Sequence, residues 1–420
     1  MKGVCYMRLS KEWVYRLNFL LPIYRKQQNL TQKETYYDQE TNKWLISLVT
    51  INKVERRKTY VNEKTLPKIY QKLGIPVCIS NSLDEELERE IYNLYCVMEK
   101  DEIDVACIRM ENIIKMLENY NVCAYYHECF YFLIKLHNYY KKGVNLKEDD
   151  YQKLFQLVPL FTKHCKEILL DFLYIYASGS TQEKLFELMN TYNFSNSNYL
   201  PNQINFANQL YENGKKLRAY THLIRIEPKT NSLGSKSQLG YLYVILSSIT
   251  LRVDEELCRI YLKKMEAMLD ECDKNKTTKG MLLLNLANRY ILLNEYEQVK
   301  RFTEEYRLLY RNRHVEHNVI KLCYCAHMLN QPFGSDWFLD EYVVKEDQLD
   351  LALYEYFKGI ERGVEKNMKF LMKKVKPYLT EYDQTYVKII RDELYLLSNQ
   401  SGSYISYIRF IEEFKNIIFA

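Results

Sequence analysis

The sequence predicts an all-α protein, and three observations lead to this fold class. The 420 residues include only 12 Gly and 8 Pro, so the residues that interrupt helices are scarce. From about residue 84 onward, apolar residues recur at helical spacing in segments of roughly 12 to 18 residues joined by short polar connections. No comparable run alternates apolar and polar residues with period two. We therefore expect helices throughout.

The helical segments form pairs that recur along the chain. Candidate first helices of these pairs begin near Glu88, Tyr126, Glu167, Gln203, Leu239, Gly280, Glu316, Leu349 and Thr385. Their spacing clusters around 35 to 40 residues, which is typical of tetratricopeptide-like and related α-solenoid repeats. Small residues at Ala207, Ala219 and Ala287 would let paired helices approach closely. We expect residues 84–420 to form an α-solenoid of helix hairpins.

A separate N-terminal head is indicated by a connection and by charge. Residues 76–84 contain Pro76 and a candidate helix N-cap at Ser82, and they separate a head of residues 1–78 from the repeats. Residues 1–75 hold 15 Lys and Arg against 6 Asp and Glu, a balance of +9, whereas the remainder has a balance of −4. Such asymmetry is typical of a phosphate-binding domain attached to a protein-binding body. A merely solvated basic domain is the alternative.

Short helices are expected within the head. Leu17 to Gln28 is amphipathic and basic, and Thr31 is placed to cap a second helix. Thr50 to Arg57 makes a short third helix, and Glu63 to Leu73 makes a fourth that Gly74 ends.

Four segments of the head resemble the helix-turn-helix domain of phage-repressor type. These are Ile23-Tyr24-Arg25-Lys26, Leu30-Thr31-Gln32-Lys33-Glu34, Ser47 with Thr50-Ile51-Asn52-Lys53-Val54-Glu55-Arg56, and Leu66-Pro67-Lys68-Ile69-Tyr70-Gln71-Lys72-Leu73-Gly74-Ile75. The resemblance implies that the segment matching Ser47 to Lys53 is the recognition helix. Two features differ from the family: Tyr36 to Trp44 replaces its short turn, and Arg57 stands where it usually has Gly.

A recognition helix presents short polar or basic side chains to base edges, while neighbouring residues bind phosphates. Ten residues of the head have the required chemistry. The predicted DNA-binding residues are Thr31, Gln32, Lys33, Ser47, Thr50, Asn52, Lys53, Arg56, Arg57 and Lys58, with Lys43 as a further phosphate candidate.

A helix-turn-helix head on a tetratricopeptide-like body resembles the peptide-pheromone-responsive regulators of Gram-positive bacteria, of the Rgg, PlcR and PrgX kind. The resemblance implies a homodimer that binds duplex DNA and a short linear peptide, with the peptide altering the spacing of the two heads. The alternative is a tetratricopeptide-like interaction or scaffold protein whose degenerate head does not bind DNA.

Four asparagines are the predicted peptide ligands. Asn205 and Asn208 lie three residues apart and share a helix face, and Asn285 and Asn288 repeat this arrangement eighty residues later. An Asn side chain offers both a donor and an acceptor to the unpaired amides of an extended peptide. First helices usually line the concave side of such stacks. Four solvent-facing asparagines are the alternative.

We find no signature of catalysis, of a cofactor or of a metal site. No phosphate-binding Gly loop, Gly-flanked Ser nucleophile or HExxH pattern is present, so we do not expect an enzyme. His314, His317, Cys323, Cys325 and His327 lie close together, but Cys323 and Cys325 are two apart and point to different sides of a helix. We therefore expect no metal.

The compartment is inferred from the cysteines and from the absence of a leader. Eleven Cys, an odd number, are scattered singly along the chain, which favours reduced thiols in a cytoplasm. The apolar run from Trp13 to Tyr24 is interrupted by polar residues and lacks a small-residue cleavage site, so it does not read as a signal peptide. No stretch of about 18 apolar residues exists, and we expect no membrane span.

Overall fold

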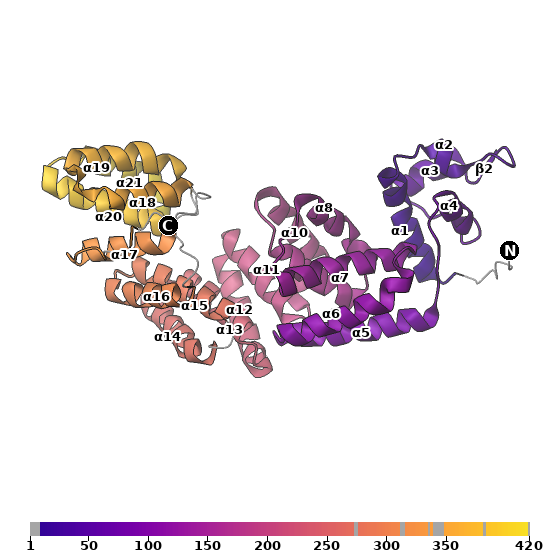
Figure 1. Ribbon diagram of the computed structural model, residues 1–420, viewed down its shortest axis with the longest axis horizontal. Helices are drawn as coiled ribbons and strands as arrows, with labels where there is room; N and C mark the ends of the chain where they lie inside the picture. Colours follow the sequence, from indigo (N-terminus) through magenta and orange to yellow (C-terminus); the bar gives the residue numbers. More distant parts are fainter. Residues whose placement is uncertain are drawn as a thin grey trace. The chain divides into compact units, whose positions relative to one another are not determined.

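The computed structural model describes residues 9–272, 276–310, 316–334, 337–338, 348–380 and 384–418. Within these ranges the chain forms 21 α-helices, several single-turn helices and one two-stranded hairpin, so the predicted all-α class is confirmed (Figure 1). The chain divides into two compact units, Met1–Gln209 and Leu210–Ala420, and the division falls within helix α11. The boundary predicted between residues 78 and 84 remains a prediction.

The first unit begins with the head and continues into helix pairs. Its helices are α1 (Lys11–Gln27), α2 (Gln32–Tyr36), α3 (Leu48–Glu55), α4 (Leu66–Lys72), α5 (Asn81–Glu99), α6 (Ile103–Leu117), α7 (Ala124–Lys142), α8 (Glu148–Leu157), α9 (Lys163–Tyr174), α10 (Gly179–Thr191) and the greater part of α11 (Leu200–Glu212). A hairpin of β1 (Tyr37–Asp38) and β2 (Lys43–Trp44) joins α2 to α3.

Helix α1 is longer than the sequence suggests. It begins at Lys11 rather than near Leu17, because the Ser10 hydroxyl accepts a hydrogen bond from the Trp13 amide and caps the first turn. Asn18 is buried in this helix, where it donates to and accepts from the backbone of Val61 at 3.0 and 2.6 Å. This pairing lets a polar residue occupy the core at little cost.

Asp84 joins the head to the first helices behind it. One of its carboxylate oxygens accepts a 2.8 Å hydrogen bond from Trp13 Nε1 of α1, and the other accepts a 2.8 Å bond from the Tyr126 hydroxyl of α7. Arg16 of α1 also pairs with this carboxylate at 3.5 Å, and its guanidinium lies 3.9 Å from the centre of the Tyr125 ring. Head and helix pairs therefore share one polar and aromatic junction.

A disulfide ties the segment after the head to the start of α7. Cys78 is bonded to Cys123, and the amide of Ala124 also donates to the Pro76 carbonyl at 3.2 Å. The expectation of reduced thiols is wrong for this pair. Its members lie 45 residues apart, and the α5–α6 pair folds back and brings them together. Eight other cysteines of the described chain are free.

The second unit consists of further packed helices. They are α12 (Lys216–Leu233), α13 (Lys236–Thr250), α14 (Glu255–Leu269), α15 (Lys276–Leu292), α16 (Tyr296–Leu309), α17 (Glu316–Met328), α18 (Gln348–Lys358), α19 (Val364–Phe370), α20 (Gln384–Ser401) and α21 (Ile405–Ile418). Successive helices pack in sequence order from α12 to α18 and again from α19 to α21, and α13 also packs against α15. Among the described helices, none combines the length and the apolar character needed to cross a bilayer.

The apolar stripes predicted from the sequence form the core. In α5 the stripe of Leu87, Ile91, Leu94, Tyr95 and Met98 is buried. Ala207, Ala219 and Ala287 are also buried, at positions where packed helices approach closely. The predicted first helices coincide with α5, α7, α9, α11, α13, α15, α17, α18 and α20. One cap differs from expectation, since Ser80 rather than Ser82 accepts the hydrogen bond that begins α5.

Candidate functional site

Helix α3 is held to the head by one apolar face. Ile51 and Val54 are buried, and the Ser47 hydroxyl accepts a 3.1 Å hydrogen bond from the Thr50 amide at the start of the helix. The hydroxyls of Ser47 and Thr50 also bond to each other at 2.8 Å. Two of the predicted base-reading residues therefore form the helix cap, which fixes the orientation of α3.

A bidentate ion pair fixes the far end of α3. Arg25 of α1 donates to both carboxylate oxygens of Glu55, from Nε at 2.7 Å and from Nη2 at 2.8 Å. The Tyr36 hydroxyl of α2 donates to the same carboxylate at 2.9 Å. Burial opposes ionisation of Glu55, but hydrogen bonds from Arg25 and Tyr36 hold its pKa below the ordinary value. Three helices of the head thus meet at one carboxylate.

The opposite face of α3 points outward. Asn52, Lys53 and Arg56, all predicted from the sequence, are exposed and lie on this face. Leu48 and Val49 extend the same face and are 52% and 64% exposed. Neither residue was among those predicted to bind DNA, because that prediction considered polar and basic side chains alone. Exposed aliphatic side chains on a helix are suited to contact with apolar groups of a partner, such as thymine methyl groups.

Several basic residues of the head are exposed and outside the ion pairs of the described chain. Lys33, Lys53, Arg56 and Lys58 are exposed, and none of them forms an ion pair with a described residue. Lys43, in the hairpin, is exposed as well. Cations without protein partners are suited to the phosphates of a nucleic acid.

Three other predicted DNA-binding residues have roles inside the head. The Thr31 hydroxyl accepts from the Glu34 amide at 3.2 Å while Glu34 accepts from the Thr31 amide at 2.6 Å, which is a capping box at the start of α2. Gln32 is the first residue of that helix. The guanidinium of Arg57 lies 3.9 Å from the centre of the Phe19 ring, where burial lowers its pKa. The backbone of Arg57 has a φ of 57°, in the region that favours glycine.

The segment that replaces the family's short turn is the β-hairpin. Tyr37 pairs with Trp44 and Asp38 pairs with Lys43 in its two-residue ladder. The rings of Tyr37 and Trp44 meet edge to face with their centres 5.3 Å apart. The hairpin therefore has its own stabilising contacts and presents Lys43 and Trp44 beside α3.

In the first unit, the predicted peptide ligands Asn205 and Asn208 already have partners within the protein. Asn205 is buried and its Nδ2 donates to Asp171 at 2.8 Å, while Asn208 Nδ2 donates to the Tyr174 hydroxyl at 2.7 Å. Burial raises the pKa of Asp171 to about 7, although hydrogen bonds from Asn205 and Tyr199 oppose the rise. Asn205 therefore stabilises a buried acid.

In the second unit, Asn285 and Asn288 share one face of α15 as predicted. Asn285 Nδ2 donates to the carbonyl of Met281, one turn earlier, at 2.9 Å. The Oδ1 atom of Asn288 is enclosed and accepts no hydrogen bond from the described residues. An unsatisfied enclosed acceptor is uncommon in native proteins. The side chain of Asn288 is otherwise half-exposed, which distinguishes it from the buried Asn205.

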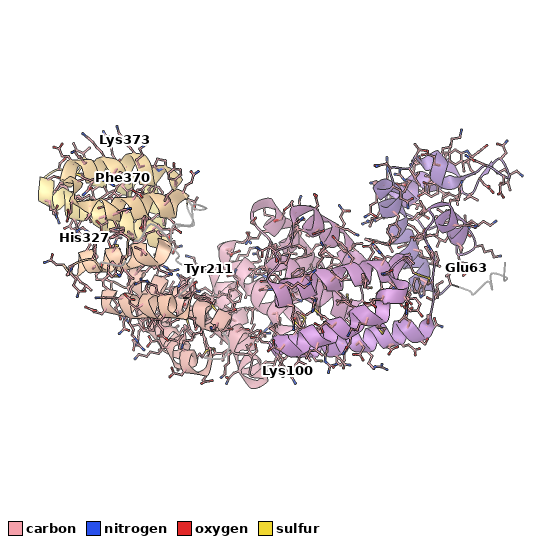
Figure 2. All side chains as sticks on the ribbon, viewed as in Figure 1. Glu63, Lys100, Tyr211, His327, Phe370 and Lys373 are labelled. Atoms are coloured by element: carbon pink, nitrogen blue, oxygen red, sulfur yellow. A yellow bond between two sulfur atoms is a disulfide. The ribbon has the colours of Figure 1, made fainter. Side chains whose placement is uncertain are left out.

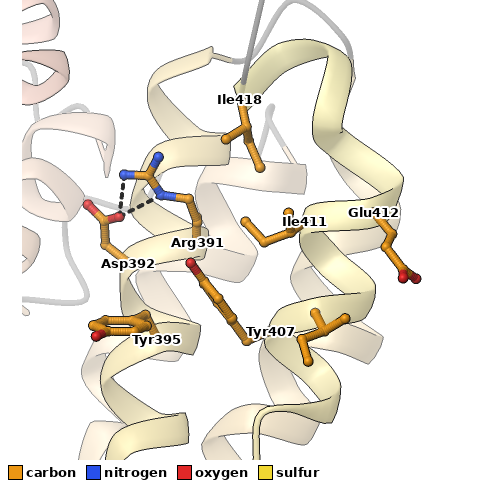
Figure 3. A pocket seen from close by; sticks show the side chains of 8 residues that line it. Arg391, Asp392, Tyr395, Tyr407, Ile411, Glu412 and Ile418 are labelled. Atoms are coloured by element: carbon orange, nitrogen blue, oxygen red, sulfur yellow. Dashed lines mark hydrogen bonds and ion pairs between the residues drawn. The ribbon is translucent and has the colours of Figure 1, made fainter.

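A pocket of about 410 Å³ lies between α20 and α21 (Figure 3). Its lining residues are Arg391, Asp392 and Tyr395 from α20 and Tyr407, Ile408, Ile411, Glu412 and Ile418 from α21. Arg391 points toward Asp392 and pairs with it at 2.7 Å. Because this cation is already neutralised, the pocket offers mainly apolar and aromatic surface to a ligand.

The residues considered for zinc serve other purposes where they are described. Cys323 and Cys325 are buried in α17, and burial raises the pKa of each thiol. His327 donates through Nδ1 to the Glu393 carboxylate at 2.8 Å. His314 lies outside the described residues, and the side chain of His317 is not described. Among the described residues, no three His, Cys, Asp or Glu side chains are grouped as metal ligands.

The contact of His327 with Glu393 predicts a pH-dependent stability. Glu393 is fully buried, accepts a further 2.7 Å bond from Tyr356, and raises the pKa of His327 by hydrogen bonding (His327 is labelled in Figure 2). A raised folded-state pKa stabilises the fold below the ordinary His pKa, and this stability is lost as pH rises through the folded-state value. We expect His327→Gln to remove that part of the pH dependence. The measurement is urea unfolding of both proteins between pH 5.5 and 8.5, and parallel curves for the two would contradict the prediction.

Comparisons with known proteins add no relative to these observations. No protein-family model, no curated protein and no solved structure matches the chain.

Proposed function

We propose that this protein is a transcriptional regulator that binds duplex DNA through a helix-turn-helix variant made of α2, the hairpin and α3. The outward face of α3 is the observation that carries the proposal. It combines unpaired cations, Lys53 and Arg56, with an amide reader, Asn52, on a helix whose other face and both ends are fixed. Such a rigidly mounted helix suits insertion into the major groove.

The second part of the proposal is that the repeats bind a short linear peptide and that two copies of the chain act together. Helix-pair repeats commonly bind extended peptides, and Asn285 and Asn288 lie together on a half-exposed face of α15. Two heads on one duplex gain affinity through effective concentration, which a single short reading helix needs. Peptide binding would change the spacing of the heads.

A protein-interaction role for the head is the second candidate. Trp44, Leu48 and Val49 are exposed beside one another in the chain, and exposed apolar groups also suit a protein partner. The two candidates differ in their dependence on salt, because only DNA binding releases condensed counterions from a duplex.

DNA binding is expected to weaken steeply with salt. Each neutralised phosphate contributes a slope of about −0.9 in a plot of log affinity against log salt. Replacing Lys53 and Arg56 together by Ala should flatten that slope by about 2, whereas Asn52→Ala should chiefly relax sequence preference. The measurement is fluorescence anisotropy with duplexes from the chain's own promoter region and with random duplexes.

The matched control replaces Lys366 and Lys369 by Ala, which removes the same charge from exposed positions in the second unit. Arg57→Ala should lower stability and leave the slope unchanged, because its guanidinium covers Phe19. Absence of binding at low salt would exclude the DNA-binding role and leave the interaction role.

Peptide binding is expected to depend on Asn288. Replacing this residue breaks no hydrogen bond between described residues, unlike replacement of Asn205, Asn208 or Asn285. Asn288→Ala should weaken peptide binding by about 1 to 3 kcal/mol, because a peptide amide loses its acceptor. Asn208→Ala also removes the 2.7 Å hydrogen bond from Asn208 to the Tyr174 hydroxyl, so it changes a contact within the first unit as well. Calorimetry with peptides encoded by neighbouring reading frames measures both effects. Asn190→Ala, at an exposed position, is the control, and unchanged affinity in the Asn288 variant would refute the site.

A further inference from the structure

One face of α15 is half-exposed along its whole length. The residues of this face follow helical spacing, and they are Met281, Leu284, Asn285, Asn288, Arg289 and Leu292. The adjacent helix α13 packs directly against α15. The face is therefore apolar at its ends, carries two amides in its middle, and contains a single charge, that of Arg289.

Arg289 has an unusual environment for a cation. Its Nη2 donates to the Ser248 hydroxyl of α13, and its Nε is enclosed without a hydrogen-bond partner among the described residues. Nη1 is neither bonded to a described residue nor enclosed, so a ligand can reach it. The hydroxyl of Tyr211, on α11, is a further neighbour that acts on Arg289 electrostatically (Tyr211 is labelled in Figure 2). No carboxylate of the described chain pairs with this guanidinium.

Such an arrangement has a cost in free energy. Removing a guanidinium from water is unfavourable unless a counter-charge and hydrogen bonds compensate, and burial indeed lowers the pKa of Arg289. Other shielded arginines of this chain are compensated: Arg16 pairs with Glu12 and Asp84, and Arg25 pairs with Glu55. Arg289 lacks this compensation within the part of the chain that the structure describes.

We propose that Arg289 is the anchor of an anion subsite that binds a carboxylate of the peptide ligand. The planar guanidinium matches the two oxygens of a carboxylate, and Ser248 orients it from the neighbouring helix. Asn288, one residue earlier on the same face, is half-exposed and places a polar side chain beside this subsite. The inference rests on the proposed peptide-sensing function and adds the chemistry of the ligand. The carboxylate is either the peptide's C-terminus or an Asp or Glu side chain.

Two measurements on the full-length protein test the subsite. In the first, the thermal midpoint is followed with N-acetylglycine and with the uncharged N-acetylglycinamide. The acid should raise the midpoint and the amide should not. Arg289→Gln should abolish the difference between the two compounds. Arg289→Lys should retain part of it, because the positive charge stays but the paired hydrogen bonds of a guanidinium are lost. Arg301→Gln, at an exposed position of α16, is the control and should behave as wild type.

In the second measurement, the protein selects from a pool of random heptapeptides made as free acids and from the same pool amidated at the C-terminus. If the bound carboxylate is the peptide's C-terminus, amidation should abolish binding. If it belongs to a side chain, the selected amidated peptides should contain Asp or Glu. In both cases Arg289→Gln should weaken binding about ten- to hundredfold.

The outcomes separate this inference from the proposed function. Peptides that bind the wild type and Arg289→Gln equally well would overturn the anion subsite and leave peptide sensing in place. An Arg289-dependent response to N-acetylglycine without any peptide binding would support the subsite and overturn peptide sensing. No response to either probe would overturn both.

Discussion

Cys78→Ser is expected to lower the free energy of unfolding by about 4 kcal/mol in a non-reducing buffer. The disulfide closes a loop of 45 residues and restricts the unfolded chain, which is the main source of such stabilisation. The bond also ties the segment behind the head to the start of α7, beside the hydrogen bond from Ala124 to Pro76. The loss should appear in urea unfolding as a lower midpoint.

The same protein supplies the control for this prediction. In a buffer with dithiothreitol, wild type and Cys78→Ser should unfold at nearly the same urea concentration, because the wild type then lacks the bond as well. Titration of thiols in the unfolded, unreduced wild type should find two fewer than after reduction. Equal midpoints in both buffers, together with equal thiol counts, would show that Cys78 and Cys123 are not bonded.

The disulfide illustrates what counting cysteines leaves out. An odd number of scattered cysteines favours reduced thiols on average, but the number says nothing about which two meet in space. Cys78 and Cys123 meet because two helices, α5 of 19 residues and α6 of 15 residues, form a hairpin between them. That geometry depends on where the helices end, which is the least certain feature of a prediction from periodicity.

The helices themselves were predictable because the buried face of a helix requires apolar residues at regular spacing in the sequence. The stripe of Leu87, Ile91 and Leu94 in α5 was predicted from spacing alone, and Thr31 was predicted as the cap of the second helix. The start of α1 was missed because Arg16 and Asn18 interrupt its apolar pattern. Arg16 has one partner nearby, Glu12, but its second partner Asp84 and the Val61 partner of Asn18 lie more than 40 residues away, so this part of the compensation is invisible locally.

The exposure of the residues predicted to bind ligands followed partly from the sequence, whereas their partners within the protein did not. The outward residues of α3 follow from the resemblance and from helical spacing, since Ile51 and Val54 mark the inner face. The engagement of Asn205 with Asp171 depends on a helix 34 residues earlier in the chain. Arg289 was not singled out, because an arginine on a helix normally reads as a solvated charge, and only its enclosed Nε shows otherwise.

Asp84→Ala is expected to cost about 3 to 5 kcal/mol and to loosen the head from the helices behind it. The change removes the acceptor of two shielded donors, Trp13 Nε1 and the Tyr126 hydroxyl, and one of the two carboxylates that pair with Arg16. Unsatisfied donors cost about 1 to 3 kcal/mol each, and loss of a partner from a shielded ion pair costs about 3 to 5 kcal/mol. The effects overlap, so they are not summed.

The emission of Trp13 reports this junction directly when Trp44 and Trp337 are replaced by Phe. Trp13 is 2% exposed, so its emission should shift to longer wavelength in Asp84→Ala if the junction opens to water. Glu85→Ala, at the exposed neighbouring position, is the control and should change neither emission nor stability. If Asp84→Ala unfolds at the wild-type urea concentration with unshifted Trp13 emission, the junction does not hold the head. A third outcome is that Asp84→Ala opens the junction, binds DNA with wild-type affinity and no longer responds to peptide. In that case the junction is the route by which the repeats act on the head.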